Sequence, residues 1–201
     1  SWNVLWIDAG GTVVDEGLVY VGYAGDDNAV GVTNNGTVWR NLDDVIIGFD
    51  GGTENALLVE DSSGKVVNEG QTVVGYAANN NSVVVTDVGS LLQNTGSLVI
   101  GDDVGNGNWM TVANGGVVQV GAANEGALEI GRGGISNLVS VIGVGSRLDC
   151  FGPISLVWGA PTTFDEFNGL YISDGGTVTT PSLVVSNGNL VALLGGTLDT
   201  A

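Results

Sequence analysis

Carboxylates are the main reactive groups of this chain, which has 22 Asp and Glu, 4 Lys and Arg and no His. Several of them recur at the same turn of an internal repeat, which would suit calcium because this ion takes several oxygen ligands at once. The candidate calcium ligands are Asp26, Asp27, Asp50, Asp102 and Asp103. The repeat between them carries Ala77-Ala78-Asn79-Asn80 there, and the Gly-Gly-x-Gly-x-Asp calcium motif is absent. We predict no cofactor and no specific metal site, with calcium binding as the alternative.

Catalytic groups are sparse. The absence of histidine excludes Ser-His-Asp and Cys-His chemistry. Asp165 and Glu166 are the acid pair that glycoside hydrolysis would require. Adjacent residues on a strand point to opposite sides, however, so this pair is not expected to converge on one bond. By sequence, none of the four basic residues lies in an acidic cluster that matches the one β-helical polysaccharide lyases use. We predict that the chain is not an enzyme.

The segment 159–168 is the largest departure from the internal repeat. Insertions in repeat proteins map to loops on one face, often the binding face. We therefore predict that this segment protrudes and makes local contacts. The candidate contact residues are Pro161, Phe164, Asp165, Glu166 and Phe167.

The repeat that must position these groups is marked by asparagine. One asparagine recurs every 21 to 31 residues, and apolar residues stand two and four places after it. The repeated residues are Asn3, Asn28, Asn55, Asn81, Asn108, Asn137, Asn168 and Asn189. A period in this range indicates a solenoid. Stacked asparagines can donate from the amide of one to the carbonyl of the next, so we predict a structural asparagine ladder.

Each repeat holds three short alternating apolar runs bounded by Gly, Asn or Asp, which read as three strands. One run ends in an apolar residue followed by glycine, as in Val21-Gly22 and Val74-Gly75. Counting two residues beyond the turn glycine places Val38 and Leu91 in the core and Trp39 outside it. Repeats this short leave no room for a helix. The pattern predicts an all-β, single-domain parallel β-helix of about eight rungs over residues 1–201, right-handed because the rungs vary in length.

Other residues support a scaffold. Tyr23, Phe49 and Tyr76 each follow the apolar-Gly step, so their rings should stack at one corner. Sugar-binding proteins use such platforms, but packing alone accounts for the stack, since it is worth about 0.2–1 kcal/mol per pair. Trp6 and Trp109 stand at positions whose side chains should point outward, and Trp158 should fill a widened part of the core. Cys150, the single cysteine, reads as a small buried hydrophobe.

The formal net charge of −18 limits the classes of molecule that the chain can bind. Nucleic-acid binding needs clustered Lys and Arg, so it is excluded, and so is docking on an anionic membrane. No run approaches 18 apolar residues, so no membrane insertion is expected. Like charge also discourages sideways association of a rod with flat faces.

Two repeat units carry a family resemblance. LVIGDDVGNGNWMTVANGGVV (98–118) and LEIGRGGISNLVSVIGVGSRL (128–148) look like the strand repeats of bacterial autotransporter passengers. The resemblance implies a secreted or bacterial cell-surface protein with a structural or adhesive role, and a possible glycan or host-surface ligand. The chain reads either as a segment of a longer repeat protein or as a subunit that stacks end to end with other copies. The alternative is a carbohydrate-binding or polysaccharide-degrading β-helix.

Overall fold

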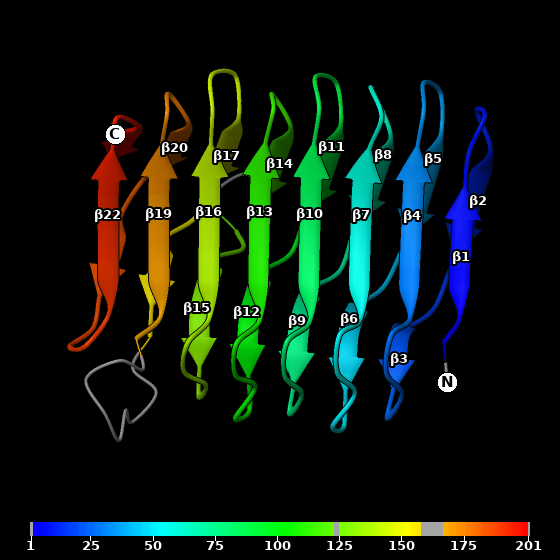
Figure 1. Cartoon of the computed structure of the whole chain (residues 1–201), viewed down its shortest axis with the longest axis horizontal. Coiled ribbons are helices and arrows are strands. Elements are labelled where there is room, and N and C mark those ends of the chain that lie inside the picture. Colours follow the sequence, from blue (N-terminus) through cyan, green and yellow to red (C-terminus); the bar gives the residue numbers. More distant parts are fainter. Residues whose placement is uncertain (1, 123–124, 158–166, 201) are drawn as a thin grey trace.

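The computed structural model describes residues 2–122, 125–157 and 167–200. The chain coils into three parallel sheets, and each strand pairs with its equivalents in the neighbouring turns (Figure 1). Sheet 1 consists of β1 (Val4–Ile7), β4 (Ala29–Thr33), β7 (Ala56–Glu60), β10 (Ser82–Thr86), β13 (Trp109–Ala113), β16 (Leu138–Ile142), β19 (Gly169–Ser173) and β22 (Leu190–Leu194). Sheet 2 consists of β2 (Thr12–Asp15), β5 (Val38–Asn41), β8 (Lys65–Asn68), β11 (Leu91–Asn94), β14 (Val117–Val120), β17 (Arg147–Cys150), β20 (Thr177–Thr180) and β23 (Thr197–Thr200). Sheet 3 consists of β3 (Val19–Tyr23), β6 (Val45–Phe49), β9 (Thr72–Tyr76), β12 (Leu98–Asp102), β15 (Leu128–Arg132), β18 (Ile154–Leu156) and β21 (Leu183–Val185).

The predicted parallel β-solenoid is therefore confirmed, with eight strands in each of the two longer sheets. Register is kept from turn to turn: Val83 of β10 lies beside Leu57 on one side and Met110 on the other. All three side chains are 0–1% exposed. Because side chains alternate across a strand, every second residue enters one continuous core. The right-handed sense stays a prediction.

The sequence-based register of sheet 2 is wrong in two turns. Trp39, not Val38, points into the core and is 2% exposed, and Leu92 takes the inward place expected for Leu91. The reason is the preceding turn, where Gly36 has a φ of +81° and is followed by Thr37, which is fully buried. The register pairs Val13 with Trp39, so Thr37 is the counterpart of Gly11, and a count that starts at Gly36 begins one residue too early. A one-residue shift moves every side chain to the other face.

Trp6 and Trp109 do point outward, as expected, and are 49% and 38% exposed. At the two ends of the rod even inward residues are open to solvent, because the terminal strands have a neighbour on one side only. Leu5 in β1 is 45% exposed and Leu193 in β22 is 50% exposed. Trp158 lies outside the described residues.

Candidate functional site

The asparagine ladder is the most extended polar feature. Asn55 Nδ2 donates to Asn81 Oδ1 at 3.0 Å, and Asn81 Nδ2 donates to Asn108 Oδ1 at 3.2 Å. The same oxygen of Asn108 also accepts from the backbone N of Asn81 at 2.8 Å. Equivalent bonds join all the predicted ladder residues: Asn3, Asn28, Asn55, Asn81, Asn108, Asn137, Asn168 and Asn189. The predicted ladder is confirmed, and it satisfies backbone groups at the bend before sheet 1.

The glycine of each apolar-Gly motif packs directly against the ladder asparagine of the following turn. A Cβ added to Gly75 would lie 2.2 Å from the amide nitrogen of Asn108, so the asparagine of the following turn occupies that space. Gly48 and Gly101 have the same relation to Asn81 and Asn137. The φ of Gly75 is +78°, a conformation that residues with a Cβ rarely adopt.

A second ladder was missed from the sequence. Asn41 Nδ2 donates to Asn68 Oδ1 at 2.8 Å, and Asn68 Nδ2 donates to Asn94 Oδ1 at 2.9 Å. The hydroxyl of Thr72 donates to Asn94 Oδ1 at 2.6 Å. The ladder lies at the end of sheet 2, where Val120 follows Asn94 in register. The spacings of 27 and 26 residues were a usable signal.

This second ladder has an open end, which leads to a stabilising substitution. Among the described residues, the buried Oδ1 of Asn41 has no hydrogen-bond partner, and Asp15 lies beside Asn41 in register. Asp15→Asn should supply an Nδ2 donor and still accept from Gly17 N. We expect the free energy of unfolding to rise by about 1 kcal/mol. Urea denaturation checks this, with Asp43→Asn as a control of equal charge; an equal gain in both variants would point to reduced repulsion instead.

An aromatic column occupies the corner after sheet 3, as predicted. The ring centroids of Tyr23 and Phe49 are 5.1 Å apart, and those of Phe49 and Tyr76 are 5.2 Å apart with an interplanar angle of 16°. Tyr20 meets both Tyr23 and Phe49 edge-on. Stacked rings cover one another's faces, and Tyr23 is the most exposed member at 61%.

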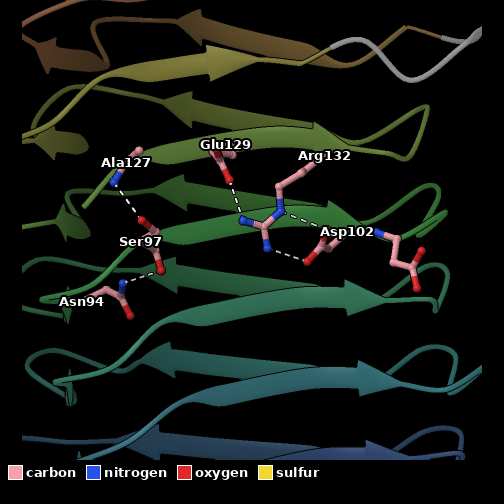
Figure 2. A network of polar contacts seen from close by, with 7 residues as sticks. Asn94, Ser97, Asp102, Ala127, Glu129 and Arg132 are labelled. Atoms are coloured by element: carbon pink, nitrogen blue, oxygen red, sulfur yellow. Dashed lines mark hydrogen bonds and ion pairs between the residues drawn. The ribbon is translucent and has the colours of Figure 1, made fainter. Parts of the chain in front are cut away.

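An ion-pair network continues this column (Figure 2). Asp102 follows Tyr76 in register and is 8% exposed. Arg132 donates to Asp102 from Nε at 3.0 Å and from Nη2 at 2.6 Å, and to Glu129 from Nη1 at 2.9 Å. The hydrogen bond to Asp102 is the main cause that raises the pKa of Arg132. The carboxylate of Asp102 is thus engaged by a cation of the protein itself.

The remaining calcium candidates are turn residues. Asp26 Oδ1 accepts from the backbone N and the hydroxyl of Thr53, both at 2.9 Å, and these bonds lower the pKa of Asp26. Asp27, Asp50 and Asp103 adopt positive φ values of 59°, 51° and 42°. Within residues 2–122, 125–157 and 167–200, no three Asp, Glu, Cys or His side chains gather into a group that could hold a metal ion. The structure therefore does not bring the candidate ligands together.

The predicted contact loop falls mostly outside the described residues, which exclude Pro161, Phe164, Asp165 and Glu166. Phe167 is described and is half-buried just before Asn168. The loop stays a prediction. Cys150 is buried beside Val120, as expected, and burial raises the pKa of its thiol.

Comparisons with known proteins give one structural similarity. No protein-family model and no curated protein matches the chain. Among solved structures, a hyper-glycosylated fragment of TibA, modified by TibC, is similar at a TM-score of 0.26 and 12% sequence identity. The alignment covers 97% of this chain and 88% of that fragment. A similarity at this level carries no argument about function. In the part of the chain that the structure describes, no helix is long and apolar enough to cross a membrane.

Proposed function

We propose that this chain is a structural or adhesive rod on the outside of a bacterial cell, secreted or held at the surface. The observation that carries the proposal is the unbroken register of the first asparagine ladder through all eight of its rungs. Such a ladder, over a continuous core, makes each turn depend on both neighbours. The stiffness of the rod, and no single cluster of side chains, is then the functional property.

The polarity of the ladder suits end-to-end stacking. From Asn3 to Asn137 each ladder Nδ2 donates to the Oδ1 of the next turn toward the C-terminal end, as between Asn81 and Asn108. Asn168 reaches the Oδ1 of Asn189 through its backbone N. Asn3 Oδ1 therefore offers an acceptor at the N-terminal end of the rod, whereas Asn189 Nδ2 donates within the chain to Leu156 O and Val157 O. Exposed Leu5 and Leu193 add apolar contact. A second copy, or adjoining repeats of the same kind, would extend both the sheets and the ladder. Because the contact is head to tail, it does not close and leads to filaments.

Leu193→Asp tests this stacking by placing a charge in the C-terminal cross-section. We expect the unmodified chain to form longer particles as its concentration rises, and the variant to remain monomeric, because a buried unpaired charge opposes the contact. Negative-stain imaging and light scattering measure the particle length. Gln119→Asp on the outer side of β14 is the control with the same charge change, and it should still elongate. Unmodified chains that stay single at high concentration would contradict end-to-end stacking.

Carbohydrate binding is the second candidate, and the aromatic column favours it. Exposed Tyr23, with Tyr20 edge-on to it, lies at the same corner as Asp26 and Asp27. A pyranose ring could pack on the open side of Tyr23. We expect Tyr23→Ala to abolish retardation in a polysaccharide-containing native gel, while Tyr171→Ala on sheet 1 leaves it unchanged. An unmodified chain that no polysaccharide retards would exclude this candidate.

A further inference from the structure

The outer face of sheet 1 is nearly free of charge. Its eight strands contain a single charged residue, Glu60 at the end of β7. Sheet 2 differs, since its strands include three of the four basic residues and several acids: Asp15, Arg40, Lys65, Arg147, Asp149 and Asp199. In a chain with a net charge of −18, a neutral sheet of this size is an exception that composition alone does not explain.

Acidic residues border this face on both sides. The turns that leave sheet 1 contain Asp8, Asp61, Asp87 and Asp174. The turns that enter it contain Asp26, Asp27 and Glu54. The neutral strip therefore runs along the rod between two negative borders. Burial, with repulsion from Asp61 and Asp87, raises the pKa of Glu60, so the charged form of the one acid on the strip is disfavoured.

The strip is flat as well as neutral. The strands of sheet 1 lie side by side with little change of direction along the rod (Figure 1). Large rings lie beside glycines: a Cβ on Gly31 would meet the Trp6 ring at 2.2 Å, and one on Gly169 would meet the Tyr171 ring at 2.7 Å. These rings therefore take up space that a side chain would otherwise fill. Exposed apolar groups remain at Trp109 and Ile142, both 38% exposed.

We infer that sheet 1 is a lateral docking face for the same face of a second copy of this chain. Two flat sheets pack face to face at about 10 Å, with their strands within about 30° of one another. Eight strands spaced by about 4.8 Å and five residues long give a face of roughly 550 Å². Two such faces together remove about 1,100 Å² or more from water, which is near the lower limit for a specific interface. The pair is therefore weak, and because the contact is isologous it stops at two rods.

The strip itself carries no charge that a basic partner could recognise beyond Glu60, so the flat neutral strip of a second copy is the matching surface. The acidic borders oppose this contact at low salt and set its salt dependence. Two copies bring acidic borders near each other, so the pair should form more readily as ionic strength rises and the Debye length falls from about 10 Å at 0.1 M to about 3 Å at 1 M. A partner with basic borders would show the opposite dependence. This contact is independent of end-to-end stacking, because it doubles the cross-section of the particle and leaves its length unchanged.

Sedimentation equilibrium and small-angle X-ray scattering at 0.1 M and 1 M NaCl test the inference. We expect dimers at 1 M salt with a thicker cross-section, a dimer dissociation constant at least about tenfold weaker for Thr111→Glu, and a tighter one for Glu60→Gln. Gln93→Glu on sheet 2 and Glu16→Gln in a turn between sheets 2 and 3 carry the same charge changes away from this face and should leave the constant unchanged. A chain that stays monomeric at 1 M salt would overturn the inference. Dimers that Leu193→Asp abolishes and Thr111→Glu does not would overturn it in favour of stacking alone.

Discussion

Asn108→Leu should lower the free energy of unfolding by about 3 kcal/mol, because leucine fills the same space without the hydrogen bonds of the amide. The substitution removes the acceptor for the backbone N of Asn81 at 2.8 Å and the donor to Ala78 O at 3.0 Å. Both groups are buried, and a buried polar group without a partner costs about 1–3 kcal/mol. Chemical denaturation followed by circular dichroism measures the change.

Gln93→Leu is the control for this substitution, because Gln93 lies on the outer side of β11 and belongs to neither ladder. It should change the free energy of unfolding by less than about 0.5 kcal/mol. An Asn108→Leu variant as stable as the control would mean that the ladder does not stabilise the solenoid.

Gly75→Ala should be as damaging for a different reason. The added Cβ would lie 2.2 Å from the amide of Asn108, so the turn or the ladder must shift, and the φ of +78° is strained for alanine. Together these effects should cost about 3 kcal/mol or more. Gly51→Ala separates them, because Gly51 has a φ of +83° but no atom within 4 Å of the added Cβ. We expect that control to lose only about 1 kcal/mol, from backbone strain. Equal losses of unfolding free energy in Gly75→Ala and Gly51→Ala would mean that steric contact with Asn108 contributes nothing.

Periodic features of this fold could be predicted from the sequence because a solenoid repeats its local chemistry. The first ladder and the apolar-Gly motif recur in nearly every turn, and the Tyr23–Phe49–Tyr76 column recurs in three consecutive turns. Equivalent residues of a coil stack on one another, so these contacts could be predicted from the spacing. The inward position of Trp39 was missed because Thr37 takes the turn position that Gly11 holds in the first turn, so a count from Gly36 starts one residue early and assigns the wrong face. The second ladder was missed because its polar residues occupy inward places where alternation predicts apolar ones.

Nonperiodic features required the structure. Asp102 and Arg132 are 30 residues apart, and their pairing depends on the register of β12 and β15 together with the geometry of the corner beyond them. Asp50 and Asp103 occupy the same turn position, but Ala77 separates them, and Asp26 lies two residues later in its own turn. The calcium hypothesis groups these residues by sequence alone. The neutral face of sheet 1 was hidden by the total charge, because the acids are concentrated in turns. That separation becomes visible only when the strands are sorted by sheet.

The central claim is that the glycine of one turn and the ladder asparagine of the next depend on each other through direct packing. A double-mutant cycle between Gly75 and Asn108 tests this most directly. Asn108→Ala empties the space that the Gly75→Ala methyl group would enter. We expect the double variant to be more stable than the sum of the single losses predicts by about 1–2 kcal/mol, a coupling typical of residues in contact. Single losses that add to within about 0.5 kcal/mol would contradict it, since additivity is the behaviour of independent sites.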